Sequence, residues 1–156
     1  MTHTPAPEIH APRFGLLLGS IDCHLCQAPT PTAALWVSSY REVEEGESIA
    51  AGGPALLRYI EQLDPPTLAF VQCRAPWLRM SATRTSGLTY LAHHCITCGA
   101  VQGDHFVYAP DGPYWPQDDK ALATLTLVHG QGALTAQAAA AESAWMERLE
   151  EVCHRE

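Results

Sequence analysis

Cys23-His24-Leu25-Cys26 and Cys95-Ile96-Thr97-Cys98-Gly99 are the stretches of this 156-residue chain from which its fold is predicted. Each contains a C-x-x-C pair, whose turn can aim both sulfur atoms at one ion while backbone N–H groups hydrogen-bond to the thiolates. A doubled pair is the ligand pattern of a four-thiolate zinc site. The sequence therefore predicts one structural Zn²⁺, bound by Cys23, Cys26, Cys95 and Cys98.

Strand-like sequence flanks both cysteine pairs. Residues 14–21 lead into the first pair and 33–37 lead away from it, while 88–92 and 105–108 do the same for the second. Two such hairpins with one metal between their tips form a zinc ribbon. Gly99 suits the positive-φ turn that such a knuckle makes, whereas the first pair has Gln27 at that position and is expected to be less regular.

The region between the hairpins, at about residues 38–87, is expected to be an insertion that contains a helix. Gly52-Gly53-Pro54 would start this helix and Asp64-Pro65-Pro66 would end it. Residues 67–71 then have the length and composition of a buried strand, although their continuous apolarity leaves the period open. The apolar residues that define the helix, at i, i+4 and i+7, are Leu56, Ile60 and Leu63.

The two ends of the chain differ in character. Residues 1–12 show no apolar period and predict a flexible leader, so that 13–156 would form a single domain. Residues 122–128 resemble a strand, and the alanine-rich segment 135–153 predicts an amphipathic helix. The predicted fold class is α+β: an antiparallel sheet with zinc-ribbon knuckles, a helical insertion between them and a C-terminal amphipathic helix.

Composition limits the possible partners and compartments. The chain is 47% hydrophobic and 17% charged, with a formal net charge of −8. Four thiolates and one Zn²⁺ would add a further −2, giving about −10. The apolar run 14–21 is far shorter than the roughly 20 residues of a membrane helix. We find no convincing export signal, so we expect a reducing cytoplasm, where paired cysteines bind metal more often than they form disulfides; six cysteines would also allow three bridges in a secreted protein.

Other residues near the cysteines are candidates for supporting roles. His24 and His94 would hydrogen-bond to the thiolates or replace one ligand, although a partly exposed neighbour is the simpler interpretation. Asp104 is either an acid near the metal or part of a turn that leaves the knuckle. Cys73 and Cys153 are expected to be small core residues.

The segments 81–90 and 95–106 resemble a group of uncharacterised bacterial zinc-ribbon proteins. Their second knuckle reads C-P-x-C-G-A-x-Q-G-D-x-F after a tyrosine or tryptophan, and this chain has Ile96 in place of the proline. The first pair, followed by residues 32–35, resembles their other knuckle, with His24-Leu25 in place of an aromatic and a basic residue. The resemblance supports the four cysteines as ligands and implies no known activity.

Three classes of function remain open. A metal-dependent enzyme is the least favoured, because the ligand set leaves no open position and Asp118-Asp119 is typical of a solvated loop. A nucleic-acid-binding zinc ribbon would use a basic and aromatic patch. The chain has nine basic and 17 acidic residues, so most of the electrostatic attraction for phosphate is missing. The residues of that patch would be Arg58, Arg74, Arg79, Arg84, Trp77 and Tyr90.

The favoured function is a non-catalytic, zinc-stabilised module that binds a partner protein. An acidic run that includes Glu44 and Glu45 would suit a basic partner, and the loop with Tyr114 and Trp115 would supply aromatic contacts. An adaptor, a regulator and an immunity-type protein all fit this pattern.

Overall fold

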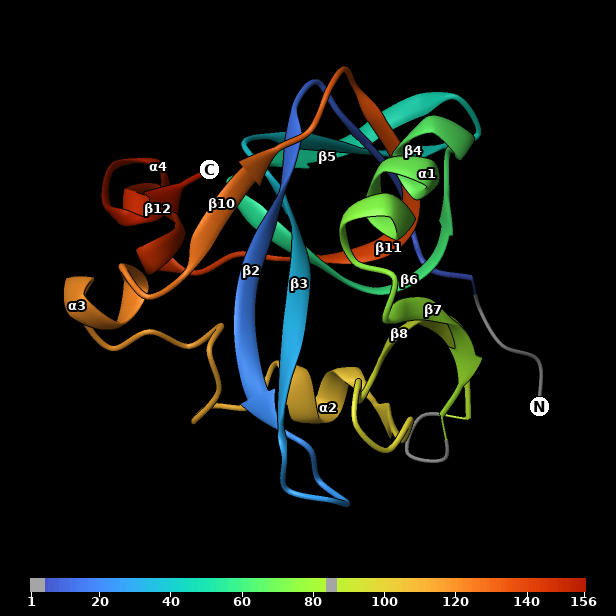
Figure 1. Cartoon of the computed structure of the whole chain (residues 1–156). Coiled ribbons are helices and arrows are strands. Elements are labelled where there is room, and N and C mark those ends of the chain that lie inside the picture. The colour runs from blue at the N-terminus through green and yellow to red at the C-terminus, as the bar shows by residue number, and fades with distance from the viewer. Residues whose placement is uncertain (1–4, 84–86) are drawn as a thin grey trace.

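The computed structural model describes residues 5–83 and 87–156, and β-strands dominate it (Figure 1). Nine strands form one curled sheet in the order β12-β10-β2-β3-β6-β11-β1-β4-β5, in which only β10 and β12 pair in parallel. Its strands are β1 (Glu8–Ala11), β2 (Phe14–Asp22), β3 (Pro29–Val37), β4 (Tyr40–Glu44), β5 (Glu47–Gly52), β6 (Ala55–Leu63), β10 (Thr126–His129), β11 (Leu134–Ala141) and β12 (His154–Arg155).

A second, three-stranded sheet carries the second cysteine pair at its β8–β9 turn. Its strands are β7 (Leu78–Ala82), β8 (Thr89–His94) and β9 (Val101–Gln102). The helical elements are short: α1 (Pro65–Arg74), α2 (Asp104–Val107), α3 (Asp119–Leu122), the 3-10 helix η1 (Ala144–Arg148) and α4 (Leu149–Val152). The predicted α+β fold with a helical insertion is therefore wrong, because the chain is mostly β.

The long β2–β3 hairpin runs through the middle of the molecule and separates two apolar cores (Figure 1). Side chains alternate between the faces of a strand, so Leu16 and Leu35 enter one core while Leu17 and Trp36 enter the other. This explains the continuous apolar runs in both strands, since each strand is buried on two sides. The same hairpin extends beyond the cores to the first cysteine pair.

The helix predicted over Leu56, Ile60 and Leu63 is instead strand β6, between β3 and β11. Two neighbouring pairs of this ladder are Gln62 with Gln137 and Arg58 with Ala139, so β6 contains an extra two residues between them. Tyr59, within this bulge, has φ 50°. The bulge breaks the two-residue alternation and produces an apolar spacing that mimics a helix.

The segment predicted as a strand, residues 67–71, lies in helix α1. Asp64 is the N-cap and accepts a hydrogen bond from the backbone N–H of Thr67 at 3.1 Å, and prolines occupy the first helical positions. Asp64-Pro65-Pro66 therefore starts a helix rather than ending one, because proline is well suited to the first turn.

The helix predicted over 135–153 is also wrong, because residues 134–141 form β11 between β6 and β1. Ala136 and Ala138 are buried against the first core, so burial and strand pairing override the helix propensity of alanine. Only the short turns η1 and α4 follow.

Three smaller expectations also differ from the structure. Residues 8–11, expected in the leader, form β1 between β11 and β4, where Ile9 is fully buried. Residues 105–108, expected as the strand after the second knuckle, lie mainly in α2, and the strand there is the short β9. The strand expected at 122–128 is displaced, with α3 ending at Leu122 and β10 starting at Thr126.

Candidate metal centre

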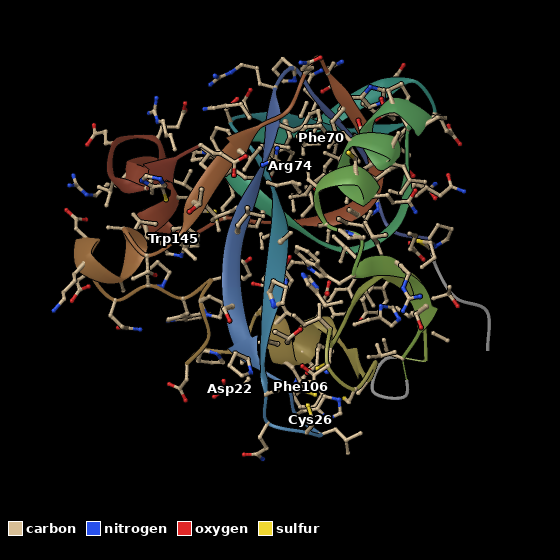
Figure 2. The ribbon with its side chains drawn as sticks, in the orientation of Figure 1. Asp22, Cys26, Phe70, Arg74, Phe106 and Trp145 are labelled. Atoms are coloured by element: carbon tan, nitrogen blue, oxygen red, sulfur yellow. The ribbon has the colours of Figure 1, made fainter. Side chains whose placement is uncertain are left out.

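The four predicted cysteine ligands come together at the tips of the β2–β3 and β8–β9 hairpins (Figure 2). The Sγ atoms of Cys23 and Cys98 are 3.6 Å apart, those of Cys26 and Cys95 are 3.7 Å apart, and all four lie within 4.8 Å of one another. A tetrahedral ion with metal–sulfur bonds of about 2.3 Å requires sulfur–sulfur separations of about 3.8 Å. The cluster can therefore bind one metal ion.

The two knuckles have the same backbone geometry. Cys23 N–H donates to the carbonyl of Ala28 at 2.9 Å, and Cys95 N–H donates to that of Ala100 at 2.9 Å. The residue after each second cysteine has positive φ, 68° at Gln27 and 80° at Gly99. The expectation for Gly99 is confirmed, and Gln27 adopts the same turn, so the first knuckle is not less regular.

Backbone N–H groups of the knuckles point at the sulfur atoms. Cys23 Sγ accepts from Leu25 and Cys26 N–H, both at 3.4 Å. Cys95 Sγ accepts from Thr97 at 3.3 Å and Cys98 at 3.5 Å. Such donors disperse the charge of a thiolate, as a metal ligand requires.

These contacts move the thiol pKa values in different directions. Burial alone would raise the pKa of Cys23, but the N–H donors and neighbouring thiols outweigh it and lower the pKa to about 6. The hydrogen bonds from Cys98 and Thr97 N–H likewise lower the pKa of Cys95. The N–H of Ala28 alone would lower the pKa of Cys26, but burial and the adjacent sulfurs outweigh it and raise the pKa to about 12. Four thiolates this close repel one another, and a bound divalent cation would relieve that repulsion.

Gln102, which is not among the predicted site residues, connects the two knuckles. Its Nε2 donates to Cys23 Sγ at 3.2 Å and to the carbonyl of Ala100 at 2.9 Å. Its Oε1 accepts from the backbone N–H of His24 at 3.1 Å, and the side chain is fully buried. The only signal in the sequence was an amide placed four residues after Cys98.

The predicted histidines lie beside the cluster without joining it. His24 Nε2 is 2.8 Å from the carbonyl of Val101, and its ring stacks on Phe106 with centroids 4.4 Å apart. His94 Nδ1 lies 3.2 Å from the carbonyl of Trp77. Within residues 5–83 and 87–156, the metal-ligating group consists of the four cysteines. His24 therefore helps to hold one knuckle against the other.

Asp104 is neither an exposed acid nor a simple turn residue. It is buried, and its Oδ2 accepts from the backbone N–H of Tyr59 at 2.7 Å, at the bulge of β6. Its own N–H donates to the Tyr90 hydroxyl at 2.9 Å. Burial raises the pKa of Asp104 to about 6, against the opposing effects of the Tyr59 N–H and the Arg58 charge. Asp104 thus fixes the start of α2 to β6.

Two buried side chains attach the second knuckle and its sheet to β3. His93 Nε2 lies 2.9 Å from the backbone N and 3.0 Å from the carbonyl of Ala33. Burial lowers the pKa of His93 to about 4, so the ring is neutral at pH 7. Thr30 Oγ1 accepts from the N–H of Ile96 at 3.1 Å. These contacts position the two cysteine pairs across 68 intervening residues.

The residues predicted for partner binding lie in two separate segments of the chain, and one of them is buried. Glu44 and Glu45 are exposed at the β4–β5 turn, far along the sheet order from β2 and β3. Tyr114 is buried, and its hydroxyl donates to the carbonyl of Leu17 at 2.7 Å and lies 2.9 Å from Thr32 Oγ1. Trp115 is 52% exposed.

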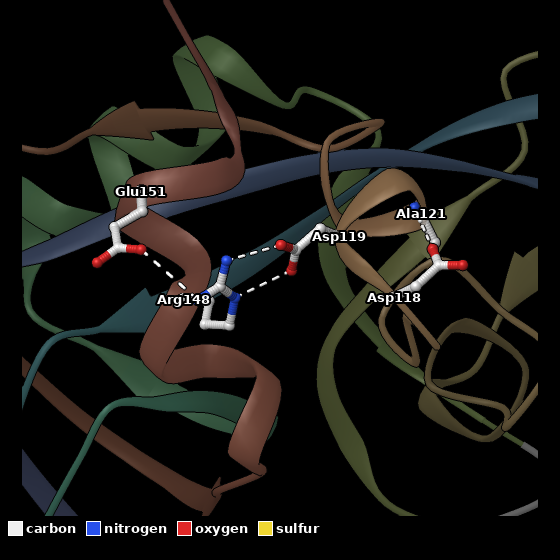
Figure 3. A network of polar contacts seen from close by, with 5 residues as sticks. All are labelled: Asp118, Asp119, Ala121, Arg148 and Glu151. Carbon is white, nitrogen blue, oxygen red and sulfur yellow. Dashed lines mark hydrogen bonds and ion pairs between the residues drawn. The ribbon is translucent and has the colours of Figure 1, made fainter.

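The adjacent carboxylates Asp118 and Asp119 have separate structural roles (Figure 3). Asp118 Oδ1 accepts from the N–H of Ala121 at 2.8 Å and caps α3. Asp119 pairs with Arg148 through two hydrogen bonds, of 3.0 and 2.6 Å, and those bonds lower the pKa of Asp119. These two carboxylates are therefore engaged in structural contacts rather than paired with each other.

The predicted basic and aromatic patch is only partly exposed. Tyr90 is buried, Arg58 lies over the ring of Tyr108, and Arg74 pairs with Glu156. Arg84 lies outside the described residues.

The two cysteines outside the cluster were both expected in the core. Cys153 is buried as predicted, whereas Cys73 is exposed.

Within the described residues, no helix has the length and apolar character needed to cross a membrane. Comparison with protein-family models, with curated proteins and with solved structures gives no match.

Proposed function

We propose that this chain is a non-catalytic zinc-ribbon module that is stabilised by one Zn²⁺ and binds a basic partner protein. Support for zinc comes from the all-thiolate ligand set and its near-tetrahedral spacing, since soft sulfur ligands in this arrangement suit Zn²⁺. Four protein ligands fill a tetrahedral ion, and catalytic zinc usually keeps one position for water. The ion therefore has a structural role.

The observation that carries the binding proposal is the acidic hairpin β4–β5 at a free edge of the large sheet. Glu47 to Ala51 of β5 are all exposed, and among the described strands β5 pairs only with β4. At the end of this hairpin Glu44 is the last residue of β4, Glu45 lies in the turn and Glu47 is the first residue of β5. This local charge, on a chain of net charge −8, favours a basic partner and speeds its association at low salt. An adaptor, a regulator and an immunity-type protein would all work in this way.

The test reverses charge on the hairpin. The double variant Glu44→Lys/Glu45→Lys is compared with the native chain and with Glu147→Lys/Glu151→Lys, which reverses two exposed acidic residues elsewhere. Each zinc-loaded protein is used to isolate and quantify a stoichiometric partner from native lysate. The proposal expects a basic partner whose capture falls at least tenfold with the hairpin variant alone. Equal capture by all three proteins, or no stoichiometric partner, would contradict it.

A further inference from the structure

We propose that a cavity between β6, the 108–115 segment and η1 binds one uncharged aromatic ring that carries an oxygen acceptor. The cavity has a volume of about 110 Å³. Leu56 of β6 and Ala141 of β11 line it together with aromatic side chains. Those aromatic residues are Tyr108, Tyr114, Trp115 and Trp145, the last of which is labelled in Figure 2.

Arg58 supplies a hydrogen-bond donor to the lining of this cavity. Its guanidinium carbon lies 4.8 Å from the centroid of the Tyr108 ring and 5.7 Å from that of Tyr59. Its Nε is buried and has no hydrogen-bond partner in the described part of the chain. A buried donor without an acceptor is unfavourable, so a ligand that brings an oxygen atom to Arg58 would gain from that bond.

The charges around the cavity select an uncharged ligand. Arg58 repels a cation. Glu142 also lines the cavity, with its carboxylate held by Gly53 N–H at 2.8 Å, and it repels an anion, as does the net charge of −8. Aromatic walls favour a planar ring, and the volume suits a group of about one ring. A phenol combines these properties, whether it is a free compound or a tyrosine side chain of a partner.

The inference does not depend on the proposed protein-binding function, because small probes test it without any partner. The zinc-loaded full chain is titrated with p-cresol, toluene, benzoate and benzylamine, four one-ring compounds that differ in their oxygen atom and charge. Binding is followed by NMR at the indole N–H signals of Trp115 and Trp145. We expect p-cresol to bind with a dissociation constant in the millimolar range, about tenfold more tightly than the other three.

Variants separate the hydrogen bond from the aromatic walls. Arg58→Met removes the donor and keeps a long side chain, so p-cresol affinity should fall about tenfold to that of toluene while toluene binding stays the same. Toluene binding also shows that this variant is folded. Trp115→Ala should weaken both compounds, and Ile49→Ala, an exposed position on β5, should weaken neither.

A fifth probe, N-acetyl-tyrosinamide, distinguishes the two sources of the ring. If N-acetyl-tyrosinamide binds as tightly as p-cresol, the ring is accepted as a side chain of a peptide, whereas tenfold weaker binding assigns the cavity to a free compound. Failure of p-cresol to saturate the indole shifts, equal binding of benzoate or benzylamine, or unchanged p-cresol affinity in Arg58→Met would overturn the proposal.

Discussion

Gln102 Nε2 lies 3.2 Å from Cys23 Sγ and thereby joins the amide of one knuckle to a sulfur atom of the other. Because Gln102 also accepts from His24 N–H, a single buried side chain holds the two hairpin tips in register. The geometry of the four-cysteine cluster therefore depends on contacts beyond the cysteines themselves, as that of thiolate metal sites generally does.

Replacement of Gln102 should weaken metal binding. In Gln102→Glu the donor to Cys23 is lost and a carboxylate is placed beside the thiolates, so we expect zinc affinity to fall by about 10- to 100-fold. Competition with a chromophoric chelator measures this affinity. Cys73→Ala, at an exposed cysteine outside the cluster, is the control and should bind zinc as the native chain does. Native affinity in Gln102→Glu would show that the bridge is incidental.

Asp104 should make stability depend on pH. Its pKa rises from 3.8 to about 6 on folding, so the folded state holds its proton more strongly and loses relative stability as pH rises from about 4 to about 6. Asp104→Asn keeps an oxygen acceptor for Tyr59 and removes the charge. We therefore expect the unfolding free energy of Asp104→Asn to increase relative to that of the native chain between pH 4 and 7, by at most about 3 kcal/mol.

Denaturant unfolding of both proteins at matched pH and saturating zinc measures this difference. Subtracting one curve from the other removes the effect of thiolate protonation, which both proteins share. A difference in unfolding free energy that stays constant from pH 4 to 7 would contradict the account.

Disruption of the Asp119–Arg148 pair should have little effect. Both side chains are more than half exposed, and an exposed ion pair contributes about 0–1 kcal/mol. Asp119→Asn should therefore lower the unfolding free energy by less than about 1 kcal/mol and leave zinc content unchanged, as thermal melts and metal analysis can check. A loss of several kcal/mol would mean that this contact, shown in Figure 3, does more than the geometry implies.

Removal of the metal should loosen one part of the molecule first. A bound zinc ion would connect the tip of β2–β3 with that of β8–β9, whereas the large sheet supplies most of the two apolar cores and the small sheet adds only Leu78 and Leu91 among the described core residues. With a strong chelator we expect a lower melting temperature and faster hydrogen exchange in β8 and β9, with slower change at the centre of β3 and β6. Uniform exchange across both sheets, or an unchanged melting temperature, would not fit this picture.

The metal site was predictable from sequence because its chemistry is local. Two C-x-x-C pairs specify the ligands, and Gly99 specifies a positive-φ turn, wherever the intervening chain goes. The β2–β3 hairpin followed in the same way from apolar runs that lead into and out of the first pair.

The rest of the fold depends on contacts distant in sequence. The bulge at Tyr59 gives β6 a spacing that resembles a helix, and nothing local marks that bulge. Alanines of β11 form a strand because β6 and β1 pair with them on either side. Asp64-Pro65-Pro66 is compatible with the end of one helix and with the start of another, and the sequence does not distinguish the two. Gln102 and His93 act through partners 79 and 60 residues away, beyond the reach of motif spacing.

Metal analysis of the native chain and of Cys98→Ala tests the central claim most directly. The account predicts one zinc ion per native chain, a sharply lower content in Cys98→Ala, and one ion in Cys73→Ala and Cys153→Ala, whose sulfur atoms lie outside the cluster. A native protein purified without metal, or a Cys98→Ala variant that retains a full zinc ion, would contradict it.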